Sequence, residues 1–362
     1  MYDALVIGAG PAGTNVSYQL SKRGFKVRMV DIKKKVGIPN HCSGLVDKRV
    51  VDLVGEDLVT DRPSSAEIST PFGSFNLRSD RMRVIDRVAL DQKLAMMAQS
   101  EGTEMSLTTM LTGLRQGDEG IVATLKSKEG FETVESKFLI GADGPTSSVR
   151  RSLGIKAPRL LASLQYDLRR SSDRVKINLN RKITPDFFSW EIPNGSEVEV
   201  GASGRNSEEV VKAMTGNDNI KRRRGGLIPI GSTELGNGRC FLIGDAAGLS
   251  KATTGGGLFA ALDSGNVLAN AMERGKDVLR DYQRSWKNSF GSEIKRDYKI
   301  RKLLDKYEKY YGLWVPLVSS SISGINRVGD VDYPSKTLLY MLYSIPMRFP
   351  LAVAEFISNL VP

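Results

Sequence analysis

The feature that most constrains the fold is a glycine-rich turn near the start of the chain, GAGPAG at residues 8–13. An aliphatic run precedes it, a helical pattern follows it, and a second apolar run ends at Asp31. This order predicts a βαβ unit whose glycines permit a tight turn, close approach of the backbone to a pyrophosphate, and close helix–strand packing. The helix N-terminus offers free N–H groups to phosphates, and Asp31 is placed to accept hydrogen bonds from a ribose. The predicted dinucleotide-binding residues in this unit are Gly8, Gly10, Ala12, Gly13 and Asp31.

Two later segments favour FAD over a nicotinamide dinucleotide. FLIGADGPTSSVR, residues 138–150, ends a strand in an Asp-Gly turn at Asp143 and Gly144. A second strand ends in Gly244-Asp245, and a triple glycine follows before a helix. An aspartate at a strand end can bind a ribityl hydroxyl, and the next helix N-terminus can face the electron-rich edge of a flavin.

The remaining pattern predicts an α/β chain with a doubly wound FAD-binding Rossmann-type domain, an antiparallel-sheet substrate domain and a C-terminal helical region. Helical periodicity marks residues 87–102, 256–275 and 278–311, and four short strands follow one another between residues 158 and 204. We expect the FAD domain to be discontinuous, over residues 1–60, 80–155 and 226–290. The substrate domain is expected over residues 61–79 and 156–225, and the helical region over residues 291–362.

The formal charge is +11, which suits an anionic partner such as a phosphorylated cofactor, a phospholipid surface or an acidic redox protein. The basic runs at 33–35 and 221–224 are typical of solvated faces, and no RNA-recognition or zinc-finger pattern occurs, so no nucleic acid is expected. Two cysteines suit a reducing cytosol, and the opening strand leaves no room for a signal peptide. The apolar stretch 337–362 is interrupted by proline and charge, which favours peripheral membrane contact over a spanning helix.

Over residues 1–290 the chain resembles flavoproteins of the aromatic-hydroxylase fold group and, within it, the geranylgeranyl reductases, most of all the archaeal membrane-lipid type. The resemblance rests on the GxGxxG turn, the Asp-Gly turn and the late Gly-Asp with its glycine run. It implies that FAD contacts Asp245 and that Arg87, in VIDRVALDQKL, also touches the cofactor. No second GxGxxG occurs, so reducing equivalents are expected from an external donor: a ferredoxin-like protein, a reduced deazaflavin or NADPH.

Three features favour the reductases within this fold group. Cys42-Ser43-Gly44 resembles the family's Cys-x-Gly loop beside the flavin ring. The stretch from Phe188 through Trp190 to Pro193 resembles the family's Tyr-x-Trp-x-Phe-Pro pattern, with Phe for Tyr and Ile for Phe. The third feature is the glycine run that lets substrate and flavin approach each other, Gly255, Gly256 and Gly257.

The aromatic stretch leaves alternatives open. Ile192-Pro193 matches the Trp-x-Trp-x-Ile-Pro pattern of flavin halogenases better, so an FAD- and O₂-dependent halogenase or monooxygenase is the alternative function. Phe188, Trp190 and Pro193 are the predicted substrate-binding residues, although alternating aromatic residues on a strand are also typical of a core.

The predicted reaction is saturation of C=C bonds in a geranylgeranyl lipid or diphosphate, by hydride from reduced flavin N5 and a proton. An isolated prenyl double bond is electron-rich, so the site needs an acid near the alkene, excluded water and a long apolar tunnel. Cys42 is the candidate to position or donate the proton. His41, the single histidine, precedes Cys42 and could tune it or only cap the loop, since adjacent side chains on an extended stretch point to opposite faces. No metal is expected. Cys240 is expected to be a small buried hydrophobe.

Overall fold

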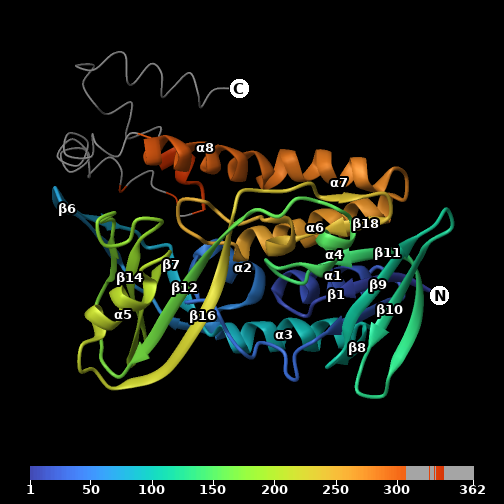
Figure 1. Ribbon diagram of the computed structural model, residues 1–362, viewed down its shortest axis with the longest axis horizontal. Coiled ribbons are helices and arrows are strands. Elements are labelled where there is room, and N and C mark those ends of the chain that lie inside the picture. The colour runs from blue at the N-terminus through green and yellow to red at the C-terminus, as the bar shows by residue number, and fades with distance from the viewer. Residues whose placement is uncertain (307–325, 327–329, 331, 338–362) are drawn as a thin grey trace, which may run out of the picture.

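The computed structural model describes residues 1–306, 326, 330 and 332–337 (Figure 1). Its larger sheet frames the dinucleotide unit. The strands follow the order β17 (Gly236–Asn237), β18 (Cys240–Leu242), β11 (Phe131–Gly141), β1 (Tyr2–Ile7), β2 (Val27–Asp31) and β8 (Glu104–Leu107). The first half of β11 also pairs with β10 (Ile121–Lys126), which pairs with β9 (Met110–Gln116).

The strands β18, β11, β1, β2 and β8 pair in parallel. Parallel strands end at one edge of a sheet, so the segments that follow β1, β2, β11 and β18 meet there. These four segments carry the glycine turn, Asp31, Asp143 and Asp245, which the sequence predicts as cofactor ligands.

Helices cover this sheet, and a hydrophobic core lies between the helices and the strands. α1 (Pro11–Ser21) contacts both α3 (Arg87–Ser100) and α6 (Leu258–Arg274), and the side chains of Leu5, Val16 and Leu20 are fully buried beneath them. The helices predicted for 87–102 and 256–275 are confirmed to within two residues at each end. Two short turns complete the unit, α4 (Ser148–Ser152) and the 3₁₀ turn η2 (Gly244–Ala247).

The second sheet lies beside the dinucleotide unit (Figure 1). Its order is β16 (Ile220–Ile230), β12 (Arg159–Leu168), β15 (Glu197–Ser203), β14 (Ser189–Asn194), β13 (Val175–Asn178), β5 (Ser65–Thr70) and β6 (Gly73–Arg78). The predicted antiparallel pairing holds except between β13 and β5, which are parallel because β5 reaches the sheet from a distant part of the chain. β16 continues past the expected domain boundary at residue 225. α5 (Ser207–Thr215) packs on one face against Tyr166, Leu168, Val198, Val200 and Ala202.

A small sheet connects the two units. Its strands are β3 (Leu45–Asp47), β7 (Met82–Ile85) and β4 (Val59–Asp61), accompanied by α2 (Lys48–Val54) and the 3₁₀ turn η1 (Glu56–Leu58). Met82 and Val84 of β7 share an apolar cluster with Trp190 and Ile192 of the second sheet. β3 therefore holds the preceding Cys42 loop between the dinucleotide unit and the second sheet.

The described C-terminal part is helical, as predicted, and lies along α6 (Figure 1). α7 (Val278–Trp286) passes through a π-helical turn, Lys287–Gly291, into α8 (Ser292–Lys306). Most of the predicted region 291–362, including nearly all of its apolar end, lies outside the described residues. Among the helices that the structure describes, none has both the length and the apolar character needed to cross a bilayer.

Candidate active site

The glycine turn is shaped by close backbone contacts. Gly8 has φ +107°, and a Cβ there would lie 2.3 Å from the carbonyl oxygen of Ala142. A Cβ on Gly13 would lie 1.8 Å from the Gly8 carbonyl oxygen, so helix and turn fit only without a side chain. A Cβ on Gly10, in contrast, would meet no heavy atom within 4 Å among the described residues. The open side of the turn is therefore at Gly10, where a pyrophosphate is expected to approach the backbone.

Asp31 fixes this turn to the end of β2. Its Oδ2 accepts from the backbone N–H of Ala9 at 2.6 Å, and its Oδ1 accepts from that of Lys33 at 2.7 Å. A carboxylate has further lone pairs, so these bonds leave capacity for the predicted ribose contact.

Asp143 and Arg150 organise the Asp-Gly turn. Asp143 Oδ2 accepts from the backbone N–H of Ser148 at 2.7 Å and caps α4, while the buried Oδ1 has no partner among the described residues. Arg150 is buried and donates to the carbonyl oxygens of Ala246 at 2.7 Å and Pro145 at 2.8 Å. This arginine, which the sequence reasoning did not single out, ties the Asp143 turn to the Asp245 turn.

Arg87, which is buried, and Asp245, which is half-buried, supply charge next to the glycine run. Burial alone would lower the pKa of Arg87, but Asp91, which accepts from it at 2.8 Å, holds that pKa above its usual value. Burial raises the pKa of Asp245 to about 6, against the opposing influence of Arg87. A Cβ on Gly257 would lie 3.2 Å from Asp245 Oδ1, so the glycine run passes close to this carboxylate.

The Cys42 loop reaches the same region. A through-space charge effect of Cys42 contributes to the raised pKa of Arg87, so the predicted cofactor arginine and the predicted catalytic cysteine lie in the same region. Cys42 is partly exposed; its N–H donates to Asn40 Oδ1 at 2.9 Å, and its sulfur accepts from the N–H of Gly44 at 3.4 Å. Gly44 has φ +81°, and a Cβ there would lie 2.3 Å from the Ile85 carbonyl oxygen. Ser43 Oγ accepts from the N–H of Leu45 at 3.3 Å and so steadies the turn into β3.

The aromatic stretch belongs to β14 of the second sheet and the residues just before it. Trp190 is buried over Gly201, where a Cβ would lie 2.3 Å from the indole, and its Nε1–H donates to Glu199 at 3.0 Å. Phe188 stacks on Phe187 with ring centroids 4.2 Å apart. A Cβ on Gly255 would lie 3.3 Å from the side chain of Ile228 and 3.5 Å from that of Phe187. The side chains nearest Gly255 are thus those of Phe187 and Ile228, which the sequence motif does not predict. Pro193 pairs with Val198 and is buried within the sheet.

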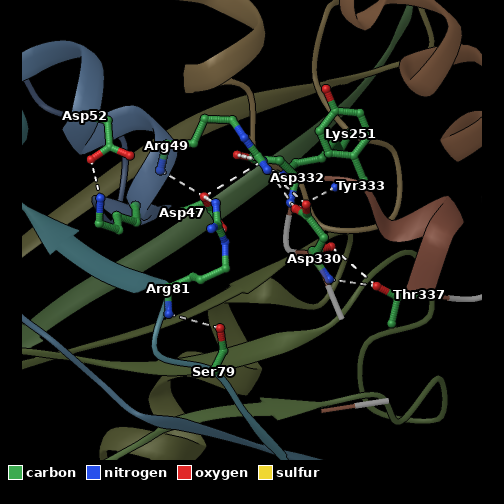
Figure 2. A network of polar contacts seen from close by, with 11 residues as sticks. Asp47, Arg49, Asp52, Ser79, Arg81, Lys251, Asp330, Asp332, Tyr333 and Thr337 are labelled. Carbon is green, nitrogen blue, oxygen red and sulfur yellow. Dashed lines mark hydrogen bonds and ion pairs between the residues drawn. The ribbon is translucent and has the colours of Figure 1, made fainter. Parts of the chain in front are cut away.

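A polar network joins the segment around residue 332 to the glycine-rich region (Figure 2). Arg49 of α2 donates to Asp330 at 2.9 Å and Asp332 at 3.2 Å, and Lys251 donates to Asp332 at 2.7 Å. Figure 2 shows Arg49 and Arg81 both directed at Asp47, which accepts from Arg81 Nε at 2.9 Å. Lys251 and Asp332 are both buried, so this network fixes the loop that leads into Gly255.

Cys240 is fully buried in β18, as predicted, and burial raises its pKa to about 12. Among the described residues, no group of three or more His, Cys, Asp and Glu side chains could hold a metal ion.

The dinucleotide edge fits FAD on three structural observations. The turn is open at Gly10. Asp143 Oδ1 is a buried acceptor and Arg87 Nε is a buried donor, and neither has a hydrogen-bond partner among the described residues. Unpaired buried polar atoms are costly, so Asp143 Oδ1 and Arg87 Nε, two of the five such side-chain atoms among the described residues, are available for bonds to a ligand.

Comparisons with known proteins agree with this geometry. Residues 1–165 match the family model described as an FAD binding domain. Digeranylgeranylglycerophospholipid reductase 1 of Methanococcoides burtonii is 30% identical over 335 residues, which cover 81% of each chain. The crystal structure of a geranylgeranyl bacteriochlorophyll reductase-like protein from Thermoplasma acidophilum superposes with a TM-score of 0.85 at 20% identity, covering 99% of both chains. A flavin-dependent brominase superposes with a TM-score of 0.74 at 15% identity, covering 99% of this chain and 98% of the brominase, which shows a shared fold.

Proposed function

The chain belongs to the geranylgeranyl reductase family of FAD-dependent oxidoreductases, and on that premise we propose that it saturates double bonds in the geranylgeranyl chains of a membrane lipid. The relationship to a lipid reductase over four-fifths of both chains is the observation that carries the reaction class. Each cycle adds a hydride to one alkene carbon and a proton to the other. Bound and reduced FAD supplies the hydride from N5.

The cofactor residues have distinct proposed roles. The turn at Gly8, Gly10, Ala12 and Gly13 and the N-terminus of α1 receive the pyrophosphate, and Asp31 receives a ribose. Arg87, Asp143 and Asp245 bind polar groups further along the cofactor, a role that the unpaired Arg87 Nε and Asp143 Oδ1 support. The ring system is proposed to lie against Ser43 and the backbone at Gly44, Gly144, Gly255, Gly256 and Gly257.

Cys42 is the proposed proton donor or positioning group. Protonation at the less substituted alkene carbon leaves tertiary cationic character on its neighbour, which then accepts hydride. A thiol is a weak acid, so this transfer must be concerted with hydride delivery. The closeness of Cys42 to Arg87 and its partial exposure support an assignment at the border between cofactor and substrate.

The proposed substrate surface is the aromatic side of the second sheet. Phe188 and its neighbour Phe187, with Ile228, offer apolar side chains opposite Gly255, a pairing suited to an isoprenoid chain. Trp190 and Pro193 support this surface from within the sheet. The electron donor is proposed to be external, a ferredoxin-like protein, a reduced deazaflavin or NADPH, and contact with the membrane is proposed to be peripheral.

The test is anaerobic turnover of the dithionite-reduced holoenzyme with a geranylgeranyl glycerolipid and, separately, geranylgeranyl diphosphate. Mass spectrometry should show a gain of two hydrogens for each double bond saturated. An absence of saturation with both substrates, together with rapid oxidation by O₂ and a hydroxylated or halogenated product, would establish the alternative monooxygenase or halogenase function. The Ile192-Pro193 pair is the observation that favours this second candidate.

Cys42→Ser and Cys42→Ala test the assigned acid. We expect kcat to fall by at least about tenfold, equivalent to about 1.4 kcal/mol of transition-state stabilisation, with FAD binding retained. Cys240→Ser is the matched control, because Cys240 lies buried in β18 and has no proposed part in the reaction. Unchanged turnover in both Cys42 variants would remove this residue from the mechanism.

A further inference from the structure

A buried polar network lies on one face of the second sheet. Arg224 of β16 donates to Asp167 and, at 2.6 Å, to Glu199 Oε2. Glu199 Oε1 accepts from the Trp190 indole, and the Gln165 amide, oriented to satisfy both neighbours, donates to Glu199 at 3.1 Å and accepts from Arg224 at 3.2 Å. The Asp167 and Arg224 side chains are each 8% exposed and that of Glu199 is 2% exposed. One guanidinium and two carboxylates are therefore enclosed together.

Strand alternation separates this network from the apolar face of the same sheet. In the basic run 221–224 the predicted solvated face is wrong for Arg224, whereas Arg222 is 51% exposed and contacts Asp167 from the rim at 3.4 Å. On the other face, Tyr166, Val200 and their neighbours pack against α5. The polar face is directed toward the small connecting sheet, because Trp190 packs there with Met82 and Val84.

The network leaves the sheet at one point, the Cys42 loop. Arg224 Nη1 donates to the carbonyl oxygen of Cys42 at 3.1 Å. The adjoining glycines of β16 let the loop approach, because a Cβ on Gly226 would lie 3.2 Å from His41 Cβ. Burial lowers the pKa of His41, and the backbone of Gly225 acts against this shift. Side chains of β12, β14 and β15 thus act through Arg224 of β16 on the backbone of one residue.

Stability alone does not account for this arrangement. Burial raises the pKa of Glu199 in spite of Arg224, so the charged carboxylate is held at a cost. Buried ion pairs are often no more stabilising than apolar side chains of similar volume, although removing one partner is strongly destabilising. The contact from Arg224 to the Cys42 carbonyl is what an apolar replacement could not reproduce.

We propose that Arg224 is a positioning residue that holds the Cys42 loop against the substrate sheet, with Asp167 and Glu199 fixing its guanidinium and Trp190 fixing Glu199. The mechanistic part of this inference rests on the proposed function, since it assumes that the place of the Cys42 thiol matters for turnover. The structural part, control of the loop by Arg224, does not. Arg224 acts through the backbone of Cys42 and is not a catalytic residue.

The test compares Arg224→Lys with Arg222→Lys in the FAD-loaded protein. Lysine keeps the charge that balances the two carboxylates but lacks the planar fork needed to reach the carboxylates and the Cys42 carbonyl together. Arg222 is the matched control because it shares the strand and the Asp167 partner but stays at the rim. The readout besides activity is the rate at which iodoacetamide alkylates Cys42, resolved from buried Cys240 by peptide mass spectrometry.

In Arg224→Lys we expect iodoacetamide to alkylate Cys42 about fivefold faster, or more, than in wild type. We expect kcat to fall about tenfold, with the KM for the lipid changed less than about threefold. Arg222→Lys should stay within about twofold of wild type in each quantity. An alkylation rate in Arg224→Lys within twofold of wild type would overturn control of the loop. Faster alkylation with unchanged kcat would overturn its role in turnover.

Glu199→Gln keeps the test decisive if Arg224→Lys does not fold. It retains the shape and the acceptor for Trp190 and leaves Arg224 paired with Asp167, so no buried charge is orphaned. We expect Cys42 alkylation in this variant to rise by about two- to fivefold, and no rise would overturn the proposal. Because alkylation needs no lipid, a failure of wild-type protein to saturate any substrate would refute the proposed function and leave this result standing.

Discussion

Replacing Gly10 by Ala separates the fold of the glycine turn from its binding of the cofactor. Gly10 has φ −81° and ψ −177°, which alanine adopts without strain, and among the described residues a Cβ there meets nothing within 4 Å. Glycine loses more freedom on folding than alanine. We therefore expect the Gly10→Ala apoprotein to equal wild type or to exceed its free energy of unfolding by about 0.4–1 kcal/mol.

FAD binding should respond in the opposite direction. The new methyl group stands on the side of the turn that the pyrophosphate is proposed to approach, so we expect the Kd for FAD to rise by about 10- to 100-fold, or about 1.4–2.8 kcal/mol. Quenching of flavin fluorescence on titration with apoprotein measures this Kd. The increase in Tm that FAD produces should shrink in parallel, since a ligand stabilises the native state in proportion to ln(1 + [L]/Kd).

Gly13→Ala is the contrasting variant. Its Cβ would lie 1.8 Å from the Gly8 carbonyl oxygen, so turn and helix must separate, and we expect a loss of more than about 3 kcal/mol in apoprotein stability. Wild-type FAD affinity in Gly10→Ala would refute the assignment of the pyrophosphate to this turn. A Gly10→Ala apoprotein destabilised by more than about 1 kcal/mol would refute the claim that the turn is open there.

Three further substitutions test burial and close packing. Because burial raises the pKa of Asp245 from 3.8 to about 6, the folded apoprotein retains a proton that the unfolded chain releases, and this stability is lost as pH rises from 3.8 through 6. Urea unfolding at pH 7.5 should therefore give the Asp245→Asn apoprotein a free energy of unfolding about 1–2 kcal/mol above that of wild type. An equally large gain at pH 4 would contradict a raised pKa for Asp245. Gly201→Ala should lower the free energy of unfolding by about 1–3 kcal/mol, because the new methyl group overpacks against Trp190, and by much less in a Trp190→Leu background. Additive losses in this double-mutant cycle would contradict close packing of Gly201 and Trp190. Gly226→Ala should lower kcat by about two- to fivefold through pressure on His41 while changing stability by less than about 1 kcal/mol; a wild-type kcat would count against close docking of the loop.

The dinucleotide edge is predictable from sequence because its determinants are local. Gly8, Asp31, Asp143 and Asp245 each stand where a β-strand ends, and the parallel order of a βαβ fold brings such ends together without detailed knowledge of packing. The second sheet is predictable as a set of strands, but its one parallel pair, β5 with β13, depends on a long-range connection that no local pattern marks.

The roles of side chains on the second sheet are harder to predict from the sequence. Arg224 belongs to a run of four basic residues, Lys221 to Arg224, with no alternation of residue type. Which members face inward therefore depends on the β12–β16 register, where Gln165 lies opposite Arg224. Likewise the motif reading selected Phe188, whereas the ring nearest Gly255 belongs to Phe187. Asp167 and Glu199 are the sequence signal for a buried arginine. Each lies on a strand with many apolar residues, and a buried carboxylate needs a charged partner.

These differences imply that cofactor binding and substrate choice have separate determinants in this fold. The cofactor edge is built from backbone shape, with Gly8 and Gly13 excluded from substitution by contacts of 2.3 and 1.8 Å, so it tolerates little variation. The proposed substrate surface is built from side chains, Phe187 and Ile228, which approach Gly255 and can be exchanged without disturbing a strand end. Substitutions that change the substrate should therefore gather on the second sheet and on the Cys42 loop. The Arg224 contact is where they would act together, because it joins that sheet to the Cys42 loop.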